Sequence, residues 1–482
     1  MTFSRHHSTP IFPHVPAQLT NQALVSQAGL GVLTSFLNAL SFRRLCEDRF
    51  SQFVPATAVH RPGKMMADLA IMLSAGGEQV TDIDQLSSSQ GLFGTVASEA
   101  TISRFMGRIK DQPAAFDYAF ATMHRTLRSR VWAAAGARNP ALRATRLDPL
   151  IIDIDASLVH VHSDKEHAAG TYKGGYGFSP MIASVDYGKG NGTGEILAVM
   201  LRPGNKGANS AADHITVLDQ ALAQLPDEFY DQDGILIGEK VLVRTDSAGA
   251  SREFLHHLDS LGLQFSTSYA LPVVNERFIG WINEKKYWEP ATDQHGEPRG
   301  DAWVIDASGV IGLNNYPPGT RIYLRAEPLH PGAKASLFDT DGNRITAFLT
   351  NAPRYNVAFL DARHRAKGRC ENRIKTLKST GLGKLPYWSF AANQAWINVA
   401  VLAMNLTSWI QLTLLPVNHP AGCWDVKRWR YRLYSIAGKL ITSSRKTRLL
   451  IPGTAPEATL LTDLLERAQA GYQQWRHGHL TA

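Results

Sequence analysis

The chain has 482 residues, of which 44% are hydrophobic and 19% are charged, a composition that is typical of a folded globular protein and excludes an intrinsically disordered one. Its length predicts two to four structural units. The 50 Lys and Arg against 42 Asp and Glu leave a net charge of +8, which favours a polyanionic partner such as nucleic acid, although mildly basic proteins without such a partner are common.

Cysteine usage and apolar stretches indicate the compartment. Cys46, Cys370 and Cys423 form neither a disulfide framework nor a C-x-x-C metal motif, which fits a reducing cytoplasm. The first residues lack the apolar core of a signal peptide. Residues 391–415 are long and apolar enough to cross a bilayer, but their many amide side chains predict a helix buried in protein. We therefore expect no membrane partner.

The N-terminal part of the chain has helical periodicity. Residues 1–25 are polar and contain proline, which predicts a flexible arm. Apolar residues then recur at spacings of three and four, so we expect a helical domain for DNA binding or dimerisation over residues 26–147. Within it, residues 98–110 predict a helix capped by Ser98, with Arg104 positioned to contact DNA as in a helix-turn-helix. A capped surface helix is the simpler alternative.

The periodicity changes to that of strands at Pro149. Helices are expected over residues 210–226 and 251–262, and a Gly-rich turn joins two strands into a hairpin. The predicted strands cover residues 150–162, 181–188, 195–204, 240–246 and 264–270. Three meandering strands, a helix and a β-α-β unit predict an α/β fold, a ribonuclease-H-like mixed sheet core, over residues 148–270 and 356–415.

Residues 271–355 interrupt this core with short strand-like runs between turn residues, which predict an all-β insertion. A charged helix is expected over residues 360–379, before the apolar helix. Residues 416–482 predict a basic, helical C-terminal region. Its segment from 426 to 450 has eight Lys and Arg, no acid and three large aromatic residues. This composition fits a surface that tracks phosphates, with Arg428 and Arg430 as candidates, although a solvated basic helix is the alternative.

Carboxylates occupy three places where a metal-dependent site requires them. Asp153 and Asp155 lie on one face of the first core strand, Asp246 ends the strand of residues 240–246, and Glu371 lies on the charged helix. Hard oxygen ligands without His or Cys suit Mg²⁺ or Mn²⁺. Two such ions can support an in-line phosphoryl displacement. Each acid alone is more often a cap, a turn residue or a surface charge, so the prediction depends on the set.

The charged helix adds cations beside Glu371. Lys375 follows Glu371 by four positions and Lys378 follows Lys375 by three, and His364 and Lys367 precede Glu371 on the same face. Such a stripe would hold phosphates next to a metal site. A solvated, salt-bridged helix is the alternative.

These motifs together resemble a known family. The pattern H-x2-K-x3-E-x6-K, from His364 to Lys378, is similar to the Y-x2-R-x3-E-x6-K signature of the IS4-like DDE transposases. More broadly, the chain resembles the bacterial insertion-sequence family numbered thirteen-eighty. The segments that carry this resemblance are residues 76–86, 97–105, 152–157, 170–186, 243–248, 325–351 and 368–378.

The resemblance implies a transposase that cleaves and strand-transfers the ends of an insertion sequence with two Mg²⁺ ions, for which Mn²⁺ can substitute. It implies Asp155, Asp246 and Glu371 as the catalytic and metal-binding acids, with Asp153 as a rival for the first position. His364 and Lys367 replace the Tyr and Arg of the signature, and Lys lacks the bidentate fork of Arg. The implied partners are terminal-repeat and target DNA, the implied assembly on DNA is a homodimer, and the implied location is the bacterial cytoplasm at the nucleoid.

The insertion offers aromatic residues for a flipped base. Trp281, Trp288 and Trp303 are candidates, because unstacked bases favour aromatic platforms. Packing in a small β core is the alternative for each. Two other functions stay open for the whole chain: a catalytically inactive DNA-binding protein of transposase descent, and a ribonuclease-H-like nuclease without strand transfer.

Overall fold

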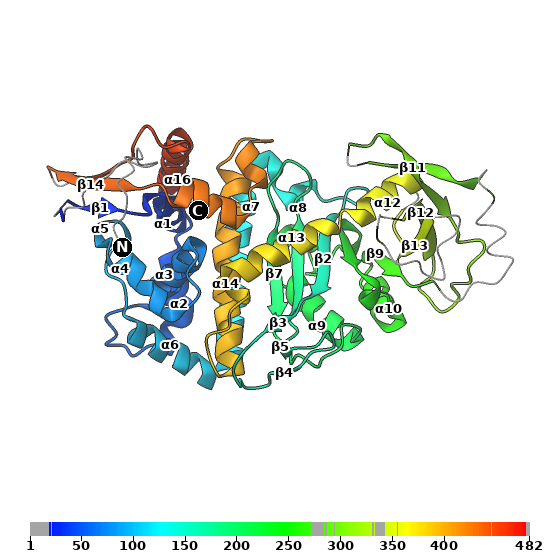
Figure 1. The fold of residues 1–482 in the computed structure, drawn as a ribbon, viewed down its shortest axis with the longest axis horizontal. Helices are drawn as coiled ribbons and strands as arrows, with labels where there is room; N and C mark the ends of the chain where they lie inside the picture. The colour runs from blue at the N-terminus through cyan, green and yellow to red at the C-terminus, as the bar shows by residue number, and fades with distance from the viewer. Residues whose placement is uncertain are drawn as a thin grey trace, which may run out of the picture.

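A computed structural model describes residues 19–20, 22–271, 284, 287–293, 295–329, 332, 343–353, 355–444 and 446–478, with side chains to residue 471. The molecule is elongated (Figure 1). A helical part lies at one end, a large mixed sheet lies in the middle, and the strands of the insertion lie at the other end.

A nine-stranded sheet forms the core of the molecule. Its order is β10-β11-β12-β13-β9-β8-β2-β6-β7. The core strands are β2 (Leu150–Ala156), β6 (Met181–Asp186), β7 (Glu195–Met200), β8 (Val241–Thr245) and β9 (Gln264–Tyr269). The strands β2, β8 and β9 run parallel, whereas β6 and β7 form an antiparallel hairpin beside β2. The α/β fold and its ribonuclease-H-like mixed sheet, predicted from the strand order, are confirmed.

The hairpin between β6 and β7 depends on its glycines. The turn of residues 187–194 contains four glycines with positive φ, and Gly194 has φ +82°. A Cβ at Gly194 would come within 2.2 Å of the carbonyl oxygen of Val185 and 2.6 Å of Nε of Arg373. Only glycine therefore lets this turn approach the arginine that is described below.

The insertion extends the core sheet. Its described strands are β10 (Glu289–Thr292), β11 (Pro298–Asp306), β12 (Arg321–Pro328) and β13 (Asn343–Thr350). They are antiparallel neighbours, and β13 pairs with the core strand β9. The strand expected near residue 312 is a turn in the structure, and the first strand-like run of the insertion lies outside the described residues.

Helices cover both faces of the sheet. Helices α9 (Ala211–Leu222) and α10 (Arg252–Ser260) follow the hairpin and β8 as predicted. The charged helix is two helices, α12 (Val357–Arg365) and α13 (Gly368–Leu377), with a break at residues 366–367 and a π-helical turn, η9 (Lys378–Leu382), at its end. In Figure 1 these helices run diagonally across the sheet. Helix α14 (Phe390–Thr413) then separates the sheet from the helical part.

The helical part contains both the first and the last described elements of the chain (Figure 1). Its N-terminal helices are α1 (Gly31–Ala39), α2 (Phe42–Phe50), α3 (Pro62–Ala75), α4 (Asp84–Ser87), α5 (Gln90–Phe93), α6 (Glu99–Asp111), α7 (Pro113–Ala134) and α8 (Pro140–Arg143). Its C-terminal elements are α15 (Val426–Trp429), η11 (Arg430–Tyr434), β14 (Gly438–Ser443), β15 (Lys446–Leu450) and α16 (Ala458–Gly478). The predicted helical C-terminal region thus contains a hairpin, and its strand β14 pairs with β1 (Leu24–Val25) of the expected N-terminal arm.

One small sheet and several 3₁₀ turns complete the described part of the chain. The strands β3 (Val159–His160), β4 (Ala169–Gly170) and β5 (Tyr176–Phe178) form a separate three-stranded sheet after β2. The 3₁₀ turns are η1 (Ala28–Leu30), η2 (Ser51–Phe53), η3 (Val80–Ile83), η4 (Gly136–Arg138), η5 (Asp227–Phe229), η6 (Gly238–Lys240), η7 (Ser247–Gly249) and η10 (Pro420–Cys423).

Helix α14 is the one described helix that is long and apolar enough to cross a membrane, by length and composition. Its most apolar window is 94% buried inside the protein. Its amides serve internal contacts: Asn405 bonds Ile196 of β7, and Gln411 accepts from Thr193 at 2.8 Å. This burial agrees with the predicted core helix.

A buried carboxylate joins the helical part to the sheet. Glu195, at the start of β7, is fully buried and accepts four hydrogen bonds. The donors are Arg128 Nε at 2.9 Å and Trp132 Nε1, Tyr187 Oη and Trp409 Nε1, each at 2.8 Å. They come from α7, the β6–β7 turn and α14. A buried carboxylate with this many donors is satisfied in the fold, and its loss would leave a guanidinium buried without its charge partner.

We therefore expect Glu195→Ala to lower the free energy of unfolding by about 3–5 kcal/mol. Thermal unfolding followed by circular dichroism measures the loss. Glu228→Ala is the matched control, because Glu228 is exposed, and this variant should stay within about 0.5 kcal/mol of the wild type. Equal midpoints for the Glu195 variant and the wild type would contradict this role.

Candidate active site

Two carboxylates lie side by side at the carboxyl ends of β2 and β8. Ile154 pairs with Thr245 in the parallel register, and the next residues of the two strands are Asp155 and Asp246. Burial raises the pKa of Asp155, and the negative charge of Asp246 adds to this rise. Lys367 acts in the opposite direction and lowers the pKa, but by less than burial raises it. Asp246 accepts a hydrogen bond from the backbone N–H of Ala248 at 3.1 Å, which orients it at the start of η7. The structure thus brings together two of the three predicted acids.

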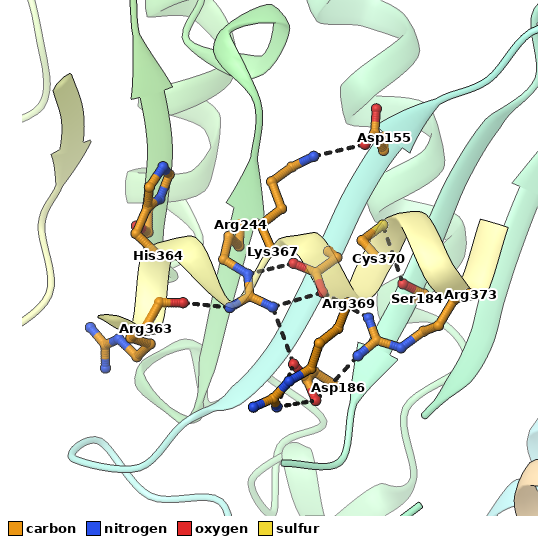
Figure 2. Close-up of polar contacts among 12 residues, drawn as sticks. Asp155, Ser184, Asp186, Arg244, Arg363, His364, Lys367, Arg369, Cys370 and Arg373 are labelled. Carbon is orange, nitrogen blue, oxygen red and sulfur yellow. Dashed lines mark hydrogen bonds and ion pairs between the residues drawn. The ribbon is translucent and has the colours of Figure 1, made fainter. Parts of the chain in front are cut away.

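An ammonium group lies beside these acids. Lys367, at the break between α12 and α13, points toward Asp155 (Figure 2), and its Nζ is 2.7 Å from Oδ2 of Asp155. Both side chains are largely buried, at 14% and 18% exposure. Burial by itself would lower the pKa of Lys367, but the charge of Asp155, with a smaller contribution from Asp246, raises it. The site therefore holds a cation at Asp155.

Glu371 lies apart from the two aspartates. It is on α13, one turn beyond Lys367, and it is exposed. Among the residues that the structure describes, no three His, Cys, Asp or Glu side chains form a group that could hold a metal. Asp155 and Asp246 offer hard oxygen ligands that fit Mg²⁺ or Mn²⁺, whereas Glu371 is not grouped with them.

Asp153, the rival for the first acid, has a different environment. It is fully buried and bonded by two guanidinium groups. Arg244 Nε is 2.5 Å from its Oδ1, and Arg244 Nη2 and Arg373 Nη1 are each 2.9 Å from its Oδ2. Since both oxygens are already engaged and no solvent reaches them, Asp153 is a structural residue beneath the site.

Asp153 belongs to a larger group, which we term the buried ion network: Asp153, Asp186, Arg244, Arg369 and Arg373. Asp186, at the end of β6, contacts all three arginines at 3.2 Å (Figure 2). Burial opposes its ionisation, but the arginines lower the pKa of Asp186 to about 2. The network fastens α13 across β8, β2 and β6.

The network was missed in the sequence. A signal was present, because Asp153 and Arg244 each interrupt an apolar strand, and buried charges of opposite sign require each other. Arg373 was hidden among the other cations of its helix. It also donates to the carbonyl oxygen of Thr193 at 2.9 Å, in the turn that Gly194 allows.

Two residues predicted to bind DNA have protein partners instead. His364 stacks on Phe348 at 4.6 Å, and its ring nitrogens contact the hydroxyls of Ser266 at 2.9 Å and Ser268 at 3.1 Å. Burial lowers the pKa of His364 to about 3, so it carries no charge for a phosphate. Arg430 donates to the carbonyl oxygens of Leu73 and Ser74 and thereby caps α3.

The remaining predicted cations lie in different places. Lys378 donates to the carbonyl oxygen of Leu158 at 2.8 Å, beyond the end of β2 and on the side of Asp155. Lys375 lines a cavity on the opposite side of α13, together with Arg428. Arg104 is exposed on α6 and donates to Thr101. The expected single stripe of cations is therefore divided between two sides of the helix.

The predicted base-stacking residues also differ from one another. Trp281 lies outside the described residues. Trp288 packs partly buried against the core, as the structural alternative expects. Trp303 is 40% exposed on β11, where its neighbours Ala302 and Val304 are fully buried on the other face. Of the described candidates, Trp303 offers the more accessible aromatic surface.

The two neighbouring aspartates should respond differently to neutralisation. Asp153→Asn removes a charge from two buried guanidinium groups, and we expect it to cost about 3 kcal/mol or more. Asp155→Asn removes a carboxylate whose pKa burial raises and which has one cationic partner, Lys367, so we expect a smaller loss than for Asp153→Asn. Unfolding midpoints at pH 7 measure both, and equal losses would contradict the assignment.

Comparison with known proteins shows to which family the chain belongs. No curated protein is similar enough to count as a relative. Among solved structures, the piggyBac transposase in a synaptic complex with hairpin DNA matches with a TM-score of 0.39 and 10% identity, over 86% of this chain and 82% of that one. The family model described as transposase DDE domain group 1 matches residues 11–472. Because this match covers nearly the whole chain, the protein belongs to the DDE transposase family, group 1.

Proposed function

We propose that this protein is an active transposase of an insertion sequence of the thirteen-eighty kind, which cleaves DNA at the element ends and joins them to target DNA. The observation that carries the proposal is the pair Asp155 and Asp246 at adjacent strand ends, in a chain that belongs to the DDE transposase family. We further propose a bacterial cytoplasmic location and a homodimer assembled on two DNA ends.

The proposed chemistry is two phosphoryl transfers. In cleavage, a water oxygen forms a bond to the scissile phosphorus, the bond to the 3′ oxygen breaks, and that oxygen leaves as a 3′ hydroxyl. In joining, the 3′ hydroxyl attacks a phosphorus of target DNA and displaces the next 3′ oxygen. Two Mg²⁺ ions, when bound, would favour deprotonation of the attacking oxygen and stabilise the negative charge that develops on the leaving oxygen.

The side chains have distinct proposed roles. Asp155 and Asp246 hold the divalent ions, with Glu371 as the third acid contributed by α13. Lys367 and Lys378 bind phosphates on the side of Asp155, since both reach the carboxyl end of β2. We also propose DNA contacts for Arg104 on α6, for Lys375 on α13 and for Arg428 on α15 of the basic C-terminal region.

Asp246→Asn should abolish cleavage of the DNA that flanks the gene of this protein and leave binding nearly unchanged. The amide keeps the shape of the side chain and removes the charge that a divalent ion needs. Gel analysis of labelled end DNA with Mg²⁺ measures cleavage, and fluorescence anisotropy measures binding. Asp227→Asn, at an exposed carboxylate that pairs with Arg125, is the control. Full activity of the Asp246 variant would contradict the proposal.

A second candidate follows from the exposed position of Glu371 apart from the aspartates: a DNA-binding protein of this family without catalysis. The same assay separates the two functions. Binding of end DNA with no cleavage by the wild type, in Mg²⁺ or Mn²⁺, would favour the binding protein.

Lys367→Met should increase the affinity of the aspartate pair for Mn²⁺ by about tenfold, because it removes a competing positive charge worth roughly 1.4 kcal/mol. Calorimetry or the electron spin resonance of free Mn²⁺ measures this without any DNA. Lys378→Met is the matched control, since Lys378 donates to a backbone carbonyl and has no carboxylate partner among the described residues. Unchanged or weaker Mn²⁺ binding in the Lys367 variant would contradict the role of the aspartates as ligands.

A further inference from the structure

Two cavities lie along the side of α12 and α13 that faces away from Asp155. Their volumes are about 940 and 550 Å³. The larger cavity is lined by Leu150 and Ile151, at the start of β2. Lys367 and Lys378 contact the opposite end of β2, at Asp155 and just beyond the strand. Both cavities share Asp186, Gly188, Arg369 and Asn372, so they form one continuous depression, which we term the back groove.

The back groove is strongly cationic. Nine Lys and Arg residues line it, against four Asp and no Glu. The cations come from separate segments of the chain: the end of the helical part, the β6–β7 turn, β8, α12 and α13, and α15. A compact anion would need donors that converge on one point. Cations spread over a long path fit an extended polyanion.

Three of the four aspartates of the groove are engaged within the protein; the fourth, Asp148, is exposed, and its charge opposes the lowering of the pKa of Arg363 by burial. Asp186 is held by three arginines of the buried ion network, visible at the bottom of Figure 2. Asp425 caps α15 by accepting from the backbone N–H of Arg428 at 2.8 Å. Asp293 accepts from the backbone N–H groups of a turn, at His295 and Glu297. Asp186 therefore offsets three of the nine cations, Arg244, Arg369 and Arg373, whereas no described ion pair joins Asp293 or Asp425 to the other cations.

Several cations of the groove have no carboxylate partner within the described part of the chain. Lys189, Lys375 and Arg428 are exposed; Nζ of Lys189 lies 3.5 Å from Nδ1 of His295, and the guanidinium of Arg428 lies 5.0 Å from the centroid of the Trp424 ring. Arg143 is exposed as well. These side chains are free to bind an external anion.

Arg363 is a second, independent indication that the groove accepts an anion. Its two terminal nitrogens are buried and have no hydrogen-bond partner in the structure. The guanidinium lies over the rings of Tyr355 and Phe359, at 5.7 and 5.6 Å, at the wall of the larger cavity. Unsatisfied buried donors are costly, so a ligand with acceptor oxygens would stabilise this position.

We propose that the back groove binds the phosphodiester backbone of a second DNA segment, separate from the strand that is cut at Asp155 and Asp246. The inference rests on the proposed function, because joining requires two DNA segments on one protein. The helix pair α12–α13 then lies between them, with Lys367 and Lys378 on one side and Arg369 and Lys375 on the other.

Salt-dependent binding tests the groove. The probe is a labelled duplex of arbitrary sequence, and the variant combines Lys189→Ala, Lys375→Ala and Arg428→Ala. Each lost phosphate contact lowers the slope of log affinity against log salt by about 0.9, so we expect a reduction of about 2 to 3. The charge-conserving set Lys189→Arg, Lys375→Arg and Arg428→Lys should keep the wild-type slope. An unchanged slope in the alanine variant would overturn the proposal.

A second control excludes a general effect of charge. Arg43→Ala, Arg299→Ala and Lys384→Ala remove three cations that pair with carboxylates elsewhere, at Glu47, Asp301 and Glu78. This variant has the same net charge as the groove variant and should retain the wild-type slope. If it lowers the slope as much as the groove variant does, the groove is not a distinct binding site.

Stoichiometry tests whether the second segment is separate. With a short duplex of about 12 base pairs at concentrations far above the dissociation constant, the wild type should bind two duplexes per chain and the groove variant one. Saturation of the wild type at one duplex would overturn the proposal. The outcome does not depend on catalysis: a wild type that binds two duplexes but cleaves none would refute the proposed transposase activity and leave the groove assignment intact.

Discussion

The buried ion network is the interaction on which the arrangement of the site depends. Asp153 and Asp186 lie in β2 and β6 with almost no exposure, and their charges are compatible with burial only because Arg244 and Arg373 bond them from β8 and α13. The contacts are directional and involve both oxygens of Asp153. They therefore fix the position of α13 along the sheet as well as its distance from the strands, and through α13 they fix Lys367 beside Asp155.

A second buried charge has a similar task at the other side of the core. Glu195 collects donors from α7, the β6–β7 turn and α14, so the helical part and the sheet share one polar junction inside an apolar interface. The β6–β7 hairpin contains Glu195, and its turn accepts a hydrogen bond from Arg373, so the hairpin connects this junction to the buried ion network. The helical part and the site are thus mechanically coupled through one hairpin with a glycine-rich turn.

The helix pair α12–α13 separates two chemical environments on the same face of the sheet. On one side, the carboxyl ends of β2 and β8 present acids and Lys367; on the other, the back groove presents arginines and lysines. Glu371 is exposed on α13 and is not grouped with the two aspartates.

Local periodicity was enough to predict the order of the core strands, the hairpin, the insertion and the core helix. The positions of Asp155 and Asp246 followed from the rule that an acid at the end of a strand faces the edge of the sheet. Tertiary structure alone decided which of two acids in β2 is buried in an ion network, because the deciding partners, Arg244 and Arg373, are 91 and 220 residues away. It also decided that His364 and Arg430 face inward and that Lys375 leaves the stripe of Lys367 and Lys378. Helical spacing gives the angle between side chains, but the break at residues 366–367 and the packing of the helix on the sheet set which side each one faces.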